Sequence, residues 1–426
     1  MSPSEDLEQR LLREIERIPV IDVHSHVPAA EPFARSLREL LGYHYYTELA
    51  HSAGMSQEVI DPQKPDGEVI PALLKAMANI DNTAQYRWLM ELAEELFGFE
   101  ERKLTEENWE PLADRVSRAA RRPDRAREIL RASGIEKVFL TNSFEEDLDE
   151  IDMDIFVPSL RADSLVFGLG DSGVREALQQ VSGVELRDAG SLRDALGAVV
   201  ERFAVGGARS AAISLPPGFQ TYPPAGAHFA HVVQRAFKGP LSPEEAEILQ
   251  SGVLFGLMRH CRDCGLPFQI MYGVVRDAYR HGVPQGTDLP AAGDTLRGLL
   301  PLVNAFPEVT FCLSVLSSSQ VQELAAYGWI IRNVVLSGHW WYLNVPRHIA
   351  SDLSARIQSV PKTKLIGYYS DMYKLEFGLA KFNMYRRVLA RVLAGDFVEV
   401  GLGSEEDAVQ IARLLLRDNA RRIFGL

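Results

Sequence analysis

Two histidines separated by one residue, His24 and His26, follow a short apolar run near the start of the chain. In an extended strand, residues i and i+2 point to the same side, so the two imidazoles would project together from the strand's carboxyl end. Neutral imidazole is a common ligand for divalent metal ions. The pattern therefore predicts a metal site, with two hydrogen-bonded polar residues at a strand end as the alternative.

Asp371 is the candidate for a third ligand, because it follows the last predicted strand of the chain. In a closed barrel the last strand neighbours the first, so this carboxylate would face the two histidines. Two imidazoles and one carboxylate leave positions open for water and substrate. The alternative is that Asp371 caps the helix that follows. We expect one divalent ion, with zinc as the first choice and manganese, iron or cobalt as alternatives.

Other candidate side chains follow the third and seventh predicted strands. Arg161 could bind a substrate carboxylate through two parallel hydrogen bonds, unless it pairs with Asp163. His339 could be a further ligand or a general base, and its alternative is a buried structural histidine. Trp340 and Trp341 come next, and neighbours on a strand point opposite ways. One of the two should therefore face the site and could stack on a sugar ring.

The elements that must position these groups are short apolar runs that alternate with helical patterns. Most of the runs lack clean period-two alternation, which is typical of strands buried on both faces. Eight repeats favour an α/β fold with a closed (β/α)8 TIM barrel over an open doubly wound sheet, because no glycine-rich phosphate loop follows the first strand. The predicted strands are Val20–His24, Lys137–Thr141, Ile155–Leu160, Ser210–Leu215, Pro267–Tyr272, Val309–Val315, Asn333–Ser337 and Leu365–Tyr369.

About a hundred residues separate the first two predicted strands, far more than a usual connection. Residues 28–136 are rich in helical patterns, so we expect a helical insertion that forms a lid within a single barrel domain of residues 1–426. Near its start, the aromatic segment Tyr43–Tyr46 predicts a flap that brings His44 or Tyr45 over a substrate. Ordinary aromatic packing is the alternative.

The composition excludes several classes of partner. The chain has 426 residues and a net charge of −13, which argues against nucleic acid because phosphate backbones are bound by Lys and Arg. No apolar run reaches the roughly 18 residues of a membrane span, and the first residues do not resemble a signal peptide. The three cysteines suggest a reducing compartment, so we expect a cytoplasmic protein. Cys261 and Cys264 lie in a helical pattern, which favours a helix face over a redox or zinc site.

Several segments, taken in order along the chain, resemble one known family. Besides the histidine pair, they are Tyr43–Tyr46, Ser159–Asp163, Ile213–Pro217, Gly338–Asn344, Tyr369–Asp371 and Asp418–Gly425. Together they resemble the uronate (glucuronate) isomerase family of the amidohydrolase superfamily, in particular its shorter, divergent bacterial branch. The resemblance covers almost the whole chain.

The resemblance implies an aldose–ketose isomerase that interconverts D-glucuronate with D-fructuronate and D-galacturonate with D-tagaturonate. It implies one divalent metal on His24, His26 and Asp371, with Arg161 and Tyr45 at the sugar acid. The reaction moves a proton from C2 to C1 through an enediol, and a carboxylate or a phenol can carry that proton. The surface of the insertion could also support a homo-oligomer.

One position departs from the family pattern. Tyr373 stands where the family typically has arginine, two residues after the metal-binding aspartate, so we expect Tyr373 to contact the substrate. Together with His339, this departure keeps a second function open: a mononuclear metal-dependent hydrolase or lyase that acts on a small carboxylated or sugar-acid substrate. A third alternative is a catalytically silent binding protein that retains the barrel.

Overall fold

The computed structural model describes residues 3–426, and at its centre is a barrel with eight strand positions. Each position overlaps one predicted strand, so the predicted (β/α)8 fold is confirmed. The strands are β1 (Val20–Asp22), β2 (Ile135–Phe139), β4 (Phe156–Val157) followed by β5 (Ser159–Arg161), β6 (Ser210–Leu215), β7 (Phe268–Tyr272), β10 (Phe311–Val315), β11 (Val334–Ser337) and β12 (Leu365–Ile366).

The barrel consists of two parallel sheets, ordered β1-β2-β4 and β12-β11-β10-β7-β6-β5-β3, where β3 is Asn142–Ser143. β4 and β5 are parts of one strand interrupted at Pro158, which has no amide hydrogen for a ladder. This strand joins the sheets on one side. On the other side, the His26 amide donates to the Met372 carbonyl (N···O 2.8 Å) and the Asp371 amide to the His24 carbonyl (3.1 Å). These bonds bring the segments after β1 and β12 together.

The strands are buried because helices cover their outer faces and side chains fill the interior. Every residue of β7, β10 and β11 is buried, as their continuous apolar runs predict. The interior also contains a small polar layer. Gln269 donates to the Ser210 hydroxyl and to the Val23 carbonyl (both 3.0 Å), and Ser210 donates to Ser159 (2.8 Å). These polar groups are buried and hydrogen-bonded, as buried polar atoms must be.

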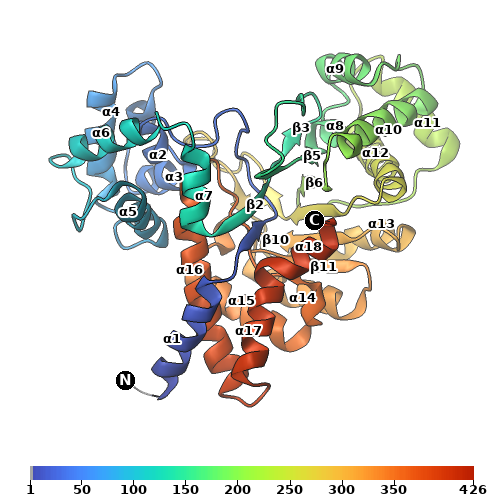
Figure 1. Ribbon diagram of the computed structural model, residues 1–426. Coiled ribbons are helices and arrows are strands. Elements are labelled where there is room, and N and C mark those ends of the chain that lie inside the picture. Colours follow the sequence, from blue (N-terminus) through green and yellow to red (C-terminus); the bar gives the residue numbers. More distant parts are fainter. Residues whose placement is uncertain (1–2) are drawn as a thin grey trace.

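The segment between β1 and β2 is helical. Figure 1 shows α2 to α6 gathered on one side of the barrel and α8 to α12 on the other. The insertion is fixed to α16 (Glu376–Leu393), where Glu91 pairs with Arg387 (2.8 Å) and the Trp88 indole nitrogen lies 3.3 Å from the Met384 sulfur. Its helices are α2 (Leu37–Leu41), α3 (His44–Ser52), α4 (Asp66–Met77), α5 (Ala84–Phe97), α6 (Trp109–Ala119) and α7 (Arg125–Ser133). A lid function for it stays a prediction.

The remaining helices surround the strands. α1 buries the stripe of Leu7, Leu11 and Ile15. Cys261 is buried in α12 and the exposed Cys264 ends it, which confirms the predicted helix face. The helices are α1 (Pro3–Glu16), α8 (Asp163–Phe167), α9 (Ser172–Ser182), α10 (Ala189–Val205), α11 (Gly226–Ala236), α12 (Pro243–Asp263), α13 (Leu300–Ala305), α14 (Val321–Ile330), α15 (Pro346–Ser359), α17 (Glu405–Arg413) and α18 (Asn419–Phe424).

Within residues 3–426, no helix combines the length and the apolar character that a membrane crossing requires. A cytoplasmic location, the lack of nucleic-acid partners and a homo-oligomeric state stay predictions.

Candidate active site

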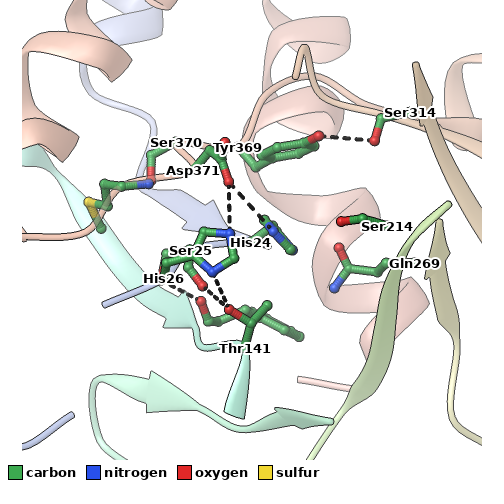
Figure 2. A network of polar contacts seen from close by, with 12 residues as sticks. His24, Ser25, His26, Thr141, Ser214, Gln269, Ser314, Tyr369, Ser370 and Asp371 are labelled. Carbon is green, nitrogen blue, oxygen red and sulfur yellow. Dashed lines mark hydrogen bonds and ion pairs between the residues drawn. The ribbon is translucent and has the colours of Figure 1, made fainter. Parts of the chain in front are cut away.

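His24, His26 and Asp371 converge at the carboxyl ends of neighbouring strand positions (Figure 2). Asp371 Oδ1 lies 3.3 Å from His26 Nε2 and 3.6 Å from His24 Nε2. One potential ligand atom from each of the three residues lies within 4.8 Å of the others. The closing bonds between the segments after β1 and β12 therefore bring the predicted ligands together.

The chemistry of these atoms fits a divalent metal ion. Both ring nitrogens of His24 and Oδ1 of Asp371 are buried and make no hydrogen bond within the described chain. Buried polar atoms without partners are costly, and a bound cation would satisfy Asp371 Oδ1 and one of the two His24 ring nitrogens. Burial lowers the pKa of His24 to about 3, so its ring stays neutral and can offer a lone pair. Burial opposes ionisation of Asp371, but His26 and His24 hold its pKa below the usual range.

Hydrogen bonds behind the cluster fix the orientation of His26. The Thr141 hydroxyl donates to the Ser25 carbonyl (2.8 Å) and lies 2.8 Å from His26 Nδ1. Because this hydroxyl has given its proton to Ser25, it accepts from Nδ1–H of His26. Nε2 of His26 then keeps its lone pair on the side of Asp371, as a metal ligand requires.

The cluster lies in a cavity of about 390 Å³. A second cavity of about 450 Å³ between the insertion and the barrel shares His44, Gln285 and Tyr373 with it but contains none of the three potential ligands. We therefore assign the chemistry to the first cavity. Its lining residues are His24, His26, His44, Thr141, Arg161, Ser214, Met271, Arg276, Gln285, Asp288, Trp340, Trp341, Asp371 and Tyr373.

Most of the predicted site residues line this cavity, but His339 does not. Its side chain is buried on the side of α15, where Nδ1 lies 3.1 Å from Asp352 Oδ2. Arg356 pairs with the same carboxylate and donates to the Gly338 carbonyl. The placement contradicts a role for His339 as ligand or base and matches the alternative, a buried structural histidine. The hydrolase hypothesis loses one of its two supports with it.

Tyr45 is also outside the cavity lining. Its ring stacks on His44 with the ring centroids 4.4 Å apart, and its hydroxyl is buried without a hydrogen-bond partner in the described chain. Successive residues of a helix point about 100° apart, because 3.6 residues make one turn. In α3, His44 therefore reaches the cavity while Tyr45 lies behind it, and the expected substrate contact of Tyr45 is wrong.

Both tryptophans line the cavity, although only one was expected to face it. The expectation assumed a continuous strand, but Trp341 has a left-handed φ of 40° and begins a 3₁₀ turn, η4 (Trp341–Leu343). Strand alternation does not apply there. The Trp341 indole donates to Glu48 (3.4 Å), whose pKa burial raises to about 8.

The polar and charged residues of one lining loop were missed from the sequence. Arg276, Gln285 and Asp288 lie after β7, on the segment that contains the short antiparallel pair β8 (Val274–Val275) and β9 (Leu289–Pro290). Arg276 donates to Asp288 (2.6 Å). The available signal was the long segment without a helical pattern after a barrel strand, because such loops form the site end of a barrel.

Arg161 and Tyr373 lie in the cavity as predicted from their positions after strands. The Arg161 side chain is about half exposed, and its Nε is 3.5 Å from Asp163 Oδ2. The Tyr373 ring lies 5.0 Å from that of His26. Burial raises the pKa of Tyr373 above its usual range, against the positive charges of Arg161 and Arg276. The phenol is therefore protonated at neutral pH.

The fold and site define a class: (β/α)8-barrel proteins with a His-His-Asp cluster suited to a divalent metal. A model of the glucuronate isomerase family matches residues 3–424, and the chain belongs to this family. The predicted family and the predicted enzyme class, an aldose–ketose isomerase of hexuronates, are thereby confirmed.

Individual relatives resemble the chain over its whole length. Uronate isomerase from Brucella melitensis biotype 1 is 26% identical over an alignment of 457 positions, which covers 99% of this chain and 97% of that protein. The crystal structure of uronate isomerase from Thermotoga maritima matches with a TM-score of 0.90 at 20% identity, over 98% of this chain and 97% of that one. Glucuronate isomerase from Caulobacter crescentus also gives 0.90 at 20% identity, over 99% and 94%. These structures share the fold.

Proposed function

We propose that this chain interconverts D-glucuronate with D-fructuronate and D-galacturonate with D-tagaturonate in the cavity described above. The observation that carries the proposal is that one cavity combines the three-ligand cluster of His24, His26 and Asp371 with two guanidinium groups, Arg161 and Arg276. An open-chain hexuronate has matching groups, with a carboxylate at one end and the oxygens of C1 and C2 at the other.

The three cluster residues would hold one divalent ion, and we propose zinc. When bound, the ion supplies Lewis acidity that polarises the substrate's carbonyl and hydroxyl oxygens. Thr141 fixes the ring of His26 so that Nε2 faces the ion site. His24 stays neutral because it is buried, and this favours binding at and below neutral pH.

The chain must move two protons. One passes from C2 to C1, and the other from the C2 hydroxyl to the C1 oxygen, so that the aldehyde becomes an alcohol and the alcohol a ketone without added water. Asp371 lies in the cavity as an ionised carboxylate and is the group we propose to carry the C2 proton. The protonated phenol of Tyr373 donates a hydrogen bond to a substrate oxygen.

Charge and shape decide how the sugar acid lies in the cavity. Arg161 and Arg276 provide the positive charge for its carboxylate, since guanidinium groups bind carboxylates through paired hydrogen bonds. Trp340 and Trp341 form an apolar wall for the carbon chain, and His44 closes the side toward the insertion.

The test is proton exchange at C2. Purified protein loaded with Zn²⁺ or Mn²⁺ is incubated with D-glucuronate or D-galacturonate in deuterated water, and the C2 proton is followed by NMR. We expect loss of that signal together with ketose formation. The Asp371→Asn protein should lose both, whereas Asp396→Asn, a change on π-helical turn η6 (Ala394–Val398), should behave as wild type.

Two outcomes contradict the proposal. Metal-loaded protein that leaves C2 unchanged for both sugar acids would show that the cavity serves another substrate. Full activity in Asp371→Asn would remove the cluster from the reaction. A panel of esters, lactones and amides would then test the remaining hydrolase hypothesis.

A further inference from the structure

A fully buried lysine, Lys381, lies on α16 behind the cluster. Its side chain is 0% exposed, and its ammonium donates to the Ser370 carbonyl (2.6 Å) and to the Tyr43 hydroxyl (2.7 Å). Three aromatic rings surround it, with centroids 4.7 Å (Tyr45), 5.0 Å (Trp88) and 5.1 Å (Tyr43) from Nζ. Burying a cation is costly unless such groups compensate, so a lysine here requires an explanation.

The bonds of Lys381 lead to the backbone of Asp371. Ser370, which accepts from Lys381, directly precedes Asp371. The Tyr43 hydroxyl, which also accepts from Lys381, donates to the Asp371 carbonyl (3.2 Å). The ammonium therefore fixes the carbonyls on both sides of the Asp371 amide and α-carbon, one directly and one through a phenol.

Asp371 needs such support because its backbone is strained. Its φ is 53°, in the left-handed region that residues with a side chain rarely adopt. A conformation of this kind persists only where the surroundings enforce it. Asp22 supports the other end of the segment by accepting from the amide and hydroxyl of Ser370. The strained backbone directs the Asp371 carboxylate toward His24 and His26.

We propose that Lys381 is a positioning residue that holds Asp371 in its ligating conformation and links it, through Tyr43, to the insertion. This inference rests on the proposed metal site. Lys381 does not line the cavity. It acts on the proposed site only through its hydrogen bonds to the backbone next to Asp371, one direct and one through Tyr43. Tyr43 immediately precedes α3, so the same bond connects Asp371 to the helix that carries His44.

Arg386 provides a matched control on the same helix. It is 4% exposed and also donates to buried carbonyls, those of Ser133 and Ile18, but it contacts none of the cluster residues. Replacing Arg386 or Lys381 by methionine removes one buried basic side chain from α16 in each case. A general loss of stability should therefore appear in both variants, and an effect on the metal site only in the Lys381 variant.

The experiment uses Co²⁺ as a spectroscopic probe of the site. The metal-free full-length proteins are titrated with Co²⁺ by calorimetry, and the visible absorption of the complex is recorded. We expect Lys381→Met to lower Co²⁺ affinity about 10- to 100-fold and to change the spectrum, as for loss of other groups that orient ligands. Tyr43→Phe should give a smaller change in the same direction. Arg386→Met should bind as wild type.

The results separate this inference from the proposed function. Wild-type affinity and spectrum in Lys381→Met would overturn the positioning role, as would equal losses in Lys381→Met and Arg386→Met. If Lys381→Met does not fold, wild-type Co²⁺ binding in Tyr43→Phe would overturn it. Wild-type protein that binds Co²⁺ but isomerises no hexuronate would contradict only the proposed function. Failure of wild-type protein to bind Co²⁺ would contradict both.

Discussion

At the scale of single residues, the cavity contains two arginines in different surroundings, and both are proposed to bind the substrate carboxylate. Arg161 is near Asp163 (3.5 Å), and Arg276 is paired with Asp288 (2.6 Å). A substrate carboxylate must compete with each aspartate for its guanidinium. The Arg276–Asp288 pair is the shorter of the two, so Asp288 fixes the orientation of Arg276 before a substrate binds. Fixing a side chain in advance lowers the entropic cost of binding.

Arg276→Met should weaken substrate binding more than turnover. A hydrogen bond to a charged group contributes about 1.5–3 kcal/mol, so we expect the KM for D-glucuronate to rise roughly tenfold or more. The change in kcat should be smaller, because the carboxylate contact exists in the ground state and the transition state. Steady-state kinetics would measure both. Arg280→Met, an exposed change on the same loop, is the control. Equal KM values in the two variants would exclude Arg276 from the substrate site.

Residue patterns predicted the cluster but not every neighbour. His24 and His26 were predictable because strand geometry places i and i+2 together, and Asp371 because barrel closure joins the first and last strands. The position of the His339 side chain was not predictable, because the local backbone decides whether a residue after a strand points inward. Gly338 precedes it with a φ of 48°, which glycine readily adopts, but the presence of a glycine does not predict the direction of the next side chain.

At the scale of elements, the insertion and the loop after β7 hold each other at the site. Gln57 donates to the carbonyls of His281 (2.6 Å) and Gly282 (2.7 Å), and His51 Nε2 lies 2.9 Å from the same His281 carbonyl. The insertion carries His44, and the loop carries Arg276. Two cavity walls that lie far apart in sequence therefore depend on a few exposed hydrogen bonds.

Gln57→Ala should loosen the loop without unfolding the barrel. An exposed hydrogen bond contributes about 1 kcal/mol, so losing two should speed amide exchange across residues 276–288 roughly thirtyfold. Hydrogen–deuterium exchange with mass spectrometry would measure this, and a raised KM should accompany it. Gln63 also lies on the insertion, but within the described residues its side chain makes no hydrogen bond to the loop, so Gln63→Ala should leave the exchange unchanged. Wild-type exchange in Gln57→Ala would show that other contacts hold the loop.

Strands and long helices were predictable, because apolar runs and helical periods appear directly in the sequence. β6, predicted over Ser210–Leu215, has those bounds in the structure. The course of the loop after β7 was not predictable. Residues 274–295 show neither a helical nor a strand period of apolar residues, and packing against the insertion decides their path. The cavity wall that Arg276 provides therefore requires the three-dimensional structure.

At the scale of the whole molecule, an acidic chain binds an anionic substrate. The net charge of −13 repels a uronate at long range, and the charge of two arginines acts only at close range. Salt screens charges beyond about 10 Å, so at ordinary ionic strength the local groups decide binding. Local surroundings also decide how ionisable groups affect the stability of the fold. The effect is largest for buried groups, because their surroundings differ most from water.

Glu376 should make the stability of the protein depend on pH. It is fully buried at the start of α16, where its carboxylate accepts from the Ala34 amide (3.2 Å), and burial raises its pKa to about 7. The nearby positive charges of Arg125 and Lys374 only partly oppose this. A carboxyl with a raised pKa binds its proton more tightly in the folded state. Its stabilising contribution is complete below about pH 4.5 and is lost as the pH rises to about 7.

Glu376→Gln should therefore flatten this dependence. The amide stays neutral and its oxygen can still accept from Ala34, so the free energy of unfolding should change less between pH 5 and pH 8, by on the order of 2 kcal/mol. Urea unfolding followed by circular dichroism at several pH values would measure it. Glu95→Gln, on the exposed face of α5, should leave the wild-type slope intact. If Glu376→Gln keeps the wild-type slope, the Glu376 carboxyl is already ionised at low pH and another group causes the dependence.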